Sequence, residues 1–322
     1  MDKERLVFKT YATYETILHD NYIQRFIDDR AHYEDSIDIW NLILEFPRVG
    51  LAITQNYRQT QDQKIASVLE MVAKPKLTVI LGGVKGGGKT GLCYWLGEEI
   101  HKRYGKDVCL FRPLDYRPDL LPNYFYVAWD ENEIKHNSFV IYDEAQIFMS
   151  SRRSMRQEHV DFSTFLSIQR HRGVSGIISQ QVIAMTDVNV WRLADHIVVK
   201  PLGRIQWESE SRRRKRDPLY MYIKLMQPLN RKETLFMDVA ELNKIVFFEN
   251  PLPSFWCDEL STPGKKIDTT KEAINYAKAM YNHVQNLKFI RENLRIKGVE
   301  WTDQEVQYFL GISRSSKRKS HK

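Results

Sequence analysis

The sequence predicts an α/β fold with a mainly parallel sheet and a helical attachment at each end. Between about residues 76 and 250, short apolar runs alternate with amphipathic stretches, as they do where helices join parallel strands. A glycine-rich loop follows the first of these runs, and an acidic pair follows another. We therefore expect a helical N-terminal region at 1–75, an α/β core at 76–250 and a helical C-terminal region at 251–322.

The N-terminal region has helical apolar spacing in three stretches, which run from Tyr14 to Asp28, from Ser36 to Phe46 and from Gln61 to Ala73. Pro47 and Pro75 end the second and third of them. Aromatic residues in this region also fall at helical spacing. This favours core and subunit contacts over a base-stacking surface.

The core opens with the apolar run Leu77–Leu81, which is typical of a buried strand, and an amphipathic stretch from Gly91 to Tyr104 follows the loop Gly83-Val84-Lys85-Gly86-Gly87-Gly88-Lys89-Thr90. Strand, loop and helix in this order form a phosphate cradle. The glycines let backbone N–H groups turn inward, and the helix start adds positive potential. We expect residues 83–91 to bind a nucleoside triphosphate, with Lys89 on the β- and γ-phosphates and the Thr90 hydroxyl on Mg²⁺.

Lys85 has a different expected role. Some P-loop proteins carry a second signature lysine directly after the first glycine, but that place is Val84 here. Lys85 is therefore expected to be a solvated loop lysine, or to lie near the phosphates of a neighbouring subunit.

The acidic half of the site is expected in Ser138-Phe139-Val140-Ile141-Tyr142-Asp143-Glu144, where four consecutive apolar residues indicate a strand buried on both faces. Asp143 would hold Mg²⁺ through water, and Glu144 would orient and activate the attacking water. An exposed acidic turn is the alternative. The spacing from the loop, which leaves room for one further strand and its helix, favours the catalytic interpretation.

A third apolar run, Gly176–Gln180, ends in a polar residue. Ligands of open α/β sheets lie at the carboxyl ends of strands, so Gln180 would lie beside Asp143 within reach of the γ-phosphate. A carboxamide can hydrogen-bond both phosphate and water, as a γ-phosphate sensor must. Gln181 is the alternative, and its place after the strand end makes it the second choice.

The remaining core elements follow the same alternation. Strands are expected at Asp107–Arg112, Tyr124–Trp129 and His196–Lys200, with a helix from His159 to Arg170. Beyond about residue 203 an antiparallel pair is expected, with the basic run Arg212-Arg213-Arg214-Lys215-Arg216 at its tip. Such a run suits contacts with the phosphate backbone of DNA, and a solvated loop is the alternative.

The C-terminal region has apolar residues at helical spacing from Lys271 to Lys297. A shorter helix is expected from Asp303 to Leu310, with Thr302 as its N-cap. A basic end follows, which includes Lys317, Arg318 and Lys319. These helices could bind DNA, dock onto a ring or form a small packing domain, and the sequence does not separate these roles.

The stretch from Leu77 to Leu202 resembles the ATPase core of the HerA–FtsK superfamily, on the residues Gly83–Thr90, Phe139–Gln146, Ile178-Ser179-Gln180 and Arg170-His171-Arg172-Gly173. The zonular occludens toxin-like branch is the most similar, with the viral genome-packaging ATPases as its neighbour. The resemblance implies a RecA-like core and a hexameric ring that moves DNA. It also implies an arginine finger supplied to the next subunit, with Arg170 and Arg172 as first candidates and Arg152, Arg153 and Arg156 as the next.

Composition bounds the class of protein further. The chain has 322 residues, 43% of them hydrophobic, which supports a globular core. The formal net charge of +7 is modest for the whole chain, but the basic residues are unevenly placed. Cys93, Cys109 and Cys257 lack the spacing of a zinc site or a disulfide framework. No signal peptide is evident, so we expect the protein in the cytoplasm of a host cell or associated with a virion.

The expected function is an ATP-driven DNA translocase that packages or moves a viral or mobile-element genome, with ATP and Mg²⁺ as cofactors and a capsid or portal protein as a further partner. The alternative is a filamentous-phage-type assembly or extrusion ATPase that acts on proteins. Members of that branch usually carry a membrane-spanning helix, whereas no window here approaches the ~20 apolar residues of a span. A nucleotide-binding regulator is disfavoured, because a switch does not need Glu144 after the metal-binding Asp143.

Overall fold

The computed structural model describes Arg25 and residues 54–73, 78–113, 116–143, 171–180, 194–201, 232–239, 244–261, 267, 269–283 and 285–312. Of the predicted helix over Tyr14–Asp28 it describes Arg25 alone. The predicted helices over Ser36–Phe46 and His159–Arg170 lie outside these residues, as does the expected hairpin with the basic run Arg212–Arg216.

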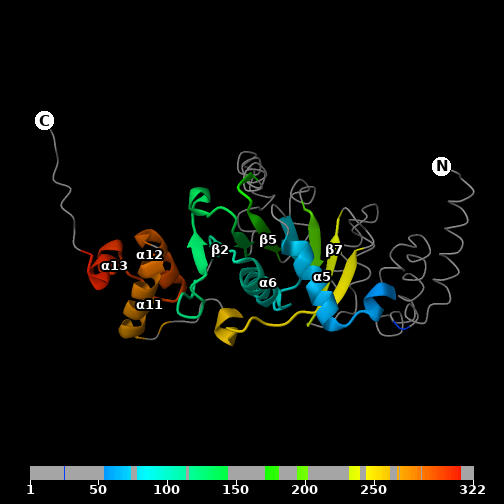
Figure 1. Cartoon of the computed structure of the whole chain (residues 1–322). Helices are drawn as coiled ribbons and strands as arrows, with labels where there is room; N and C mark the ends of the chain where they lie inside the picture. The colour runs from blue at the N-terminus through cyan, green and yellow to red at the C-terminus, as the bar shows by residue number, and fades with distance from the viewer. Residues whose placement is uncertain are drawn as a thin grey trace, which may run out of the picture.

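Among the described residues, eight strands form one sheet in the order β3-β2-β4-β5-β1-β6-β7-β8 (Figure 1). They are β1 (Thr78–Gly82), β2 (Val108–Phe111), β3 (Phe125–Ala128), β4 (Phe139–Tyr142), β5 (Ser175–Gln180), β6 (His196–Val199), β7 (Glu233–Asp238) and β8 (Ile245–Glu249). The pairs from β3 to β6 are all parallel, whereas β7 is antiparallel to both β6 and β8. The predicted fold class, a mainly parallel α/β sheet, is confirmed.

The six strands predicted between residues 77 and 200 are all present, with ends within two residues of those expected. The sequence interpretation missed β7 and β8, although both are rich in apolar residues. They extend the sheet beyond β6 by antiparallel pairing, and Leu235, Phe236 and Phe247 in them are buried. Alternation of strands and helices predicts parallel units, so it gave no signal for two strands that join the sheet in this way.

The central strands are buried along their whole length, which means that both faces of the sheet are covered there. Every residue of β2, β4 and β6 is buried, as is every residue of β5. Helix α6 (Lys89–Tyr104) packs against β2, β4 and β5, and α5 (Gln61–Ala73) packs against β8 and α6 on the same face (Figure 1). The residues of α5 are those predicted, whereas α6 begins two residues before the expected Gly91.

Within its described residues the C-terminal region contains three short α-helices that pack on one another: α11 (Thr270–His283), α12 (Leu287–Ile296) and α13 (Asp303–Leu310). The apolar spacing over 271–297 therefore belongs to two helices rather than one. Asn286 is the N-cap of α12, and its side chain accepts a hydrogen bond from the Phe289 N–H. The predicted helix Asp303–Leu310 and its Thr302 cap are both confirmed. No helix in the described part of the chain is long and apolar enough to cross a membrane.

The C-terminal helices contact the core through the segments that follow β2 and β3. Tyr276 donates from its hydroxyl to the Tyr116 carbonyl at 2.8 Å, and the Tyr116 N–H donates to the Asn293 Oδ1 at 3.4 Å. The Trp129 and Phe289 rings have their centroids 3.8 Å apart. Both aromatic contacts and buried hydrogen bonds therefore join the two regions.

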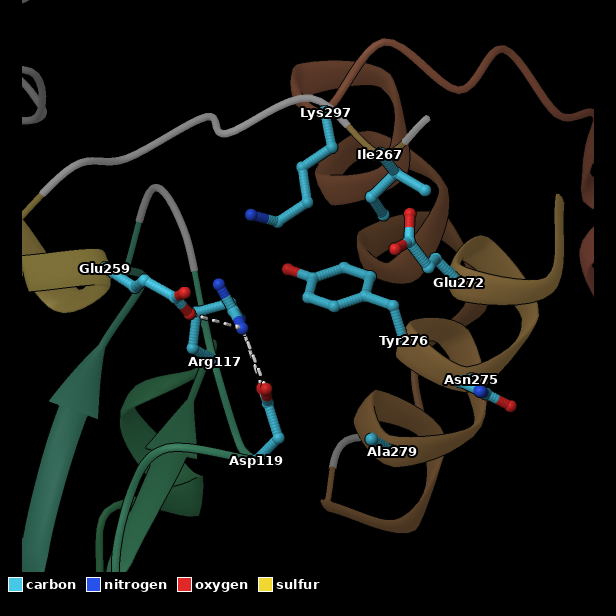
Figure 2. Close-up of a pocket in the computed structure, with 9 residues that line it drawn as sticks. All are labelled: Arg117, Asp119, Glu259, Ile267, Glu272, Asn275, Tyr276, Ala279 and Lys297. Carbon is cyan, nitrogen blue, oxygen red and sulfur yellow. Dashed lines mark hydrogen bonds and ion pairs between the residues drawn. The ribbon is translucent and has the colours of Figure 1, made fainter. Parts of the chain in front are cut away.

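A cavity of about 410 Å³ lies at the seam, the contact between the core and the C-terminal helices (Figure 2). The Arg117 guanidinium donates to Oδ1 and Oδ2 of Asp119 at 3.1 and 2.8 Å, and it lies 3.4 Å from Oε2 of Glu259. The Lys297 Nζ lies 5.0 Å from the centroid of the Tyr276 ring. None of the residues that line the cavity belongs to the glycine-rich loop, so the cavity is separate from that loop. The lining residues are Arg117, Asp119, Glu259, Ile267, Glu272, Asn275, Tyr276, Ala279 and Lys297.

Candidate nucleotide-binding site

The glycine-rich loop connects β1 to α6 and lies between strands β5 and β6 at the carboxyl edge of the sheet. Gly86 and Gly88 have φ angles of +73° and +81°, in the left-handed region that glycine adopts without strain. The Gly87 N–H donates to the Val84 carbonyl at 3.0 Å and closes a turn between them. Helix α6 starts at Lys89, directly after Gly88, so its first N–H groups lie beside the loop.

The Lys89 side chain folds back into this loop. Its Nζ donates to the carbonyls of Gly83 at 2.9 Å and Val84 at 2.8 Å, and the residue is only 8% exposed. A cation held inside a loop of backbone N–H groups gives the loop a positive interior, which attracts the phosphates of a nucleotide. Lys85, by contrast, is exposed on the outside of the loop.

Thr90 and Asp143 come together although they are 53 positions apart in the sequence. The Thr90 Oγ1 lies 3.5 Å from the Asp143 Oδ2, and both residues are partly buried. Asp143 follows the last residue of β4, and Thr90 is the second residue of α6. A hydroxyl and a carboxylate are hard oxygen donors of the kind that Mg²⁺ prefers, so this donor pair fits that ion.

Gln180 lies next to the loop at the end of β5. In the parallel register it is the partner of Gly82, the last residue of β1. Tyr142 of β4 pairs with Ile178, so Asp143 comes level with the end of β5 on its other side. Gln180 is 2% exposed, and its Nε2 has no hydrogen-bond partner in the described part of the structure. A buried amide donor without a partner costs free energy unless a ligand satisfies it.

A buried lysine lies under the loop on the side of β6. Lys200 is 0% exposed, and its backbone N–H donates to the Gly82 carbonyl at 2.8 Å. Its Nζ donates to Oγ1 of Thr234 and the carbonyl of Glu233, each at 3.0 Å, and to the Asn250 Oδ1 at 2.5 Å. Burial lowers the pKa of the Lys200 ammonium to about 8, and the nearby Glu233 charge opposes that shift. These contacts join the loop to β7 and to the segment after β8.

Lys200 also sets how close the strands can approach. A Cβ placed on Gly83 would lie 2.7 Å from the Lys200 Cβ, which is closer than side-chain atoms come. Glycine at this position therefore does more than give the loop freedom of conformation. It allows the start of the loop to pass directly over the end of β6, where the Val84 N–H donates to the Pro201 carbonyl at 3.3 Å.

The segment after β8 crosses α6 close to the loop. The Ser254 N–H donates to Oε2 of Glu98 at 2.8 Å, and the Ser254 hydroxyl donates to its Oε1. Burial acts to raise the Glu98 pKa, but the hydrogen bonds from Ser254 and Lys102 outweigh it and lower that pKa. Glu98 is 3% exposed, so this is a buried connection between α6 and the segment.

The other predicted site residues divide into two groups. Glu144 and Arg170 lie outside the described residues, as do Gln181, Arg152, Arg153 and Arg156. Arg172 is described, and it precedes β5, whereas the glycine-rich loop follows β1. Because β1 and β5 are parallel, Arg172 and the loop of the same chain lie at opposite edges of the sheet. Its guanidinium donates to the carbonyls of Glu131 at 2.9 Å and Ile134 at 2.5 Å.

Two of the cysteines are buried and are not reactive groups. Cys93 on α6 and Cys109 on β2 are 0% exposed. Burial raises the pKa of the Cys93 thiol, with a further contribution from the Asp143 charge, and burial raises the pKa of Cys109 to about 12. Both thiols stay protonated near neutral pH, as expected of small buried apolar residues.

Sequence reasoning missed Lys200 and Asn250. The predicted strand His196–Lys200 included the lysine, but no role was given to it. One signal was present in the sequence: a charged residue at the carboxyl end of an apolar strand lies at the ligand-binding edge of a parallel sheet. The position of Asn250 could not be inferred in this way, because it depends on the unpredicted strands β7 and β8.

Taken together, the strand order and the loop define a RecA-like P-loop α/β fold, with one strand, β5, between the strands that carry the loop and Asp143. No protein-family model matches the sequence. No curated protein matches it either.

The chain is similar in structure to several solved P-loop proteins. The DNA-packaging ATPase B204 of Sulfolobus turreted icosahedral virus is 16% identical, with a TM-score of 0.43 over 56% of this chain and 99% of that one. B204 of Sulfolobus turreted icosahedral virus 2, solved with AMPPCP, is 18% identical, with a TM-score of 0.44 over 55% of this chain and 100% of that one. The N-terminal domain of zonular occludens toxin from Neisseria meningitidis is 13% identical, with a TM-score of 0.33 over 56% and 96%. Both branches named from the sequence resemblance are thus represented.

The buried Lys200 should make stability depend on pH in the alkaline range. Its pKa is about 8 in the folded chain and 10.5 in its ordinary state, so between these values the unfolded chain binds more protons. The free energy of unfolding should therefore rise with pH across this window, and below it the contribution of this group should be constant. Denaturant unfolding at several pH values, compared with Lys200→Met, isolates the effect.

The exposed Lys288 on α12 provides the control, because Lys288→Met should show the same pH dependence as the natural chain. An identical rise with pH in Lys200→Met would show that another group causes it.

Proposed function

We propose that this chain is an ATP-hydrolysing motor that moves DNA, and that its task is to package or transfer a viral or mobile-element genome. The observation that supports hydrolysis best is the approach of Thr90 Oγ1 to Asp143 Oδ2, 3.5 Å apart, next to a loop that holds the Lys89 ammonium. A phosphate cradle, a cation and a pair of metal-binding oxygens at one sheet edge are the parts that phosphoryl transfer needs.

Each residue has a proposed role in this reaction. Residues 83–91 surround the triphosphate, and Lys89 exchanges its contacts with loop carbonyls for the β- and γ-phosphates. Thr90 and Asp143 hold Mg²⁺, which supplies positive charge to the phosphate oxygens. Glu144, the residue after Asp143, accepts a proton from the attacking water.

Gln180 is proposed to sense the γ-phosphate. Its amide group is buried at the end of β5 and has an Nε2 without a partner in the described part of the chain. A γ-phosphate oxygen would satisfy this donor, and the interaction would end when the phosphate leaves. The state of the nucleotide would thus reach β5, which lies at the centre of the sheet.

The motor function rests on the sequence resemblance and on charge. We propose a ring, with a hexamer as the expected form, in which an arginine of one subunit stabilises the transition state at its neighbour. Arg170 is the favoured residue, because the Arg172 guanidinium already donates to two carbonyls of its own chain. The basic run Arg212–Arg216 is proposed to contact DNA phosphates, and a capsid or portal protein is the proposed docking partner.

Two substitutions should separate nucleotide binding from hydrolysis. Lys89→Ala should abolish both, because it removes the charge opposite the β- and γ-phosphates. Glu144→Gln should keep ATP binding and lose most turnover, because an amide cannot accept the proton. ATP affinity and steady-state phosphate release measure the two effects, and Lys288→Ala, at an exposed lysine of α12 outside the site, is the control. Near-normal turnover in Glu144→Gln would remove Glu144 from the catalytic role.

The arginine finger should act between subunits. A mixture of Lys89→Ala subunits and Arg170→Ala subunits should recover part of the ATPase activity that each variant lacks alone, because some interfaces then pair an intact loop with an intact arginine. Arg172→Ala is tested in the same way. Absence of recovery at every mixing ratio, with rings still present by mass measurement, would assign the arginine to its own chain.

The basic run should bind DNA without reading its sequence. Neutralising Arg212, Arg213, Arg214 and Arg216 together should weaken binding to all DNA sequences alike. It should also flatten the dependence of log affinity on log salt by about 0.9 per lost phosphate contact with duplex DNA. Basal ATPase activity should persist, because none of these residues is proposed for the nucleotide site. An unchanged salt slope would move the DNA path elsewhere, first to Arg152, Arg153 and Arg156.

A further inference from the structure

The arrangement of strands gives the nucleotide site a direction. Asp143 directly follows β4, and Gln180 is the last residue of β5. Both strands lie on the same side of β1. These are the groups proposed for the metal and the γ-phosphate, so the triphosphate points to that side. The sugar and base must then lie on the other side of the loop, above β6, β7 and β8.

On that side the segment after β8 comes into contact with the start of α6. A Cβ on Gly91 would lie 2.9 Å from the Leu252 Cδ2 and 3.6 Å from the Trp256 Cη2. Gly91 directly follows Thr90, so its N–H belongs to the first turn of the helix that faces the phosphates. The side chains of Leu252 and Trp256 therefore lie against Gly91, the residue next to which the α-phosphate of a bound nucleotide would lie.

The segment is held in place from three directions. Asn250 accepts from the buried Lys200 ammonium at 2.5 Å, which connects it to the floor of the glycine-rich loop. Ser254 donates to the buried Glu98 of α6. The Trp256 N–H donates to the Pro253 carbonyl at 3.0 Å, and the Trp256 ring packs edge-on against Tyr94 with centroids 6.4 Å apart. Figure 1 shows the yellow segment leaving β8 and running past α6 toward the C-terminal helices.

Leu252 is apolar, yet its side chain is 54% exposed. Its neighbours in this segment, by contrast, are held by the contacts described above. An exposed apolar side chain alone is ordinary on a protein surface. Here it adjoins a partly buried tryptophan and lies at the end of the loop from which a base must project. A purine base is flat and largely apolar on its faces, so it gains by covering such a surface.

We propose that Leu252 and Trp256 form the wall against which the base of the nucleoside triphosphate packs, with Lys200 and Asn250 as residues that position this wall. The inference rests on the proposed nucleotide binding and adds the subsite for the base. The phosphates are held by the loop, and the base is held by the segment after β8.

Inorganic tripolyphosphate separates the two parts of the site, because it carries the phosphates of ATP without the base. In Leu252→Ser, ATP affinity measured by calorimetry should fall about fivefold, as loss of a partly buried leucine contact predicts. Tripolyphosphate affinity should change by less than about twofold, because Ser is uncharged and the loop is intact. Leu252→Met should keep the natural ATP affinity, since it keeps the apolar surface.

Trp256→Phe extends the test to the aromatic partner and keeps a ring against Tyr94. This substitution should lower the affinity for ATP and leave the affinity for tripolyphosphate unchanged. Ile296→Ser is the matched control, because Ile296 is a similarly exposed apolar residue on α12, at 42%. It should affect neither ligand.

Three results would contradict the inference. Unchanged ATP affinity in Leu252→Ser and Trp256→Phe would exclude the base subsite and leave the phosphate site standing. An equal loss for ATP and tripolyphosphate would show that the segment acts on the loop and not on the base. Failure of the natural chain to bind either ligand would overturn the proposed function itself, and the base subsite with it.

Discussion

The position of β1 between β5 and β6 is the constraint on which the site depends. Its register is fixed on both sides, from Thr78 to Gly82 against β5 and from Val79 to Gly82 against β6. A parallel strand cannot slide by one residue without turning every buried side chain to the other face. The loop after Gly82 therefore starts at a defined height above the sheet. Gln180 on one side and Lys200 on the other start from the same level.

Lys200 shows how this edge is stabilised at a cost. A buried ammonium loses its hydration, and only well-placed acceptors compensate for that loss. The acceptors come from two segments that are distant from Lys200 in the sequence: Glu233 and Thr234 at the start of β7, and Asn250 after β8. The antiparallel strands β7 and β8 are thus more than an extension of the sheet. They supply the polar groups that allow a lysine to lie beneath the glycine-rich loop.

The same strands lead the chain from the loop to the C-terminal helices. After Asn250 the chain contacts Gly91 and Glu98 of α6, passes through the short 3₁₀ helix Asp258–Ser261, and reaches α11 beyond Ile267. Glu259 in that helix contacts Arg117, and Tyr276 of α11 contacts Tyr116. The segment after β8 therefore contacts the start of α6 and, through Glu259, also lines the charged cavity between the core and the C-terminal helices.

The sequence by itself determined the local chemistry of this protein. The six apolar strands, the glycine-rich loop, the helix Gln61–Ala73 and the Thr302 cap all follow from residue types at short spacing, and local rules act at that range. It also predicted that Thr90 and Asp143 would serve one site, and that Gln180 would end a strand at the same edge of the sheet, because parallel strands place their carboxyl ends at one edge. Only the tertiary structure decided the rest. The partners of Lys200, the approach of Leu252 to Gly91 and the contacts of Arg172 join residues 32 to 161 positions apart, through strand pairings and packing that no local pattern encodes.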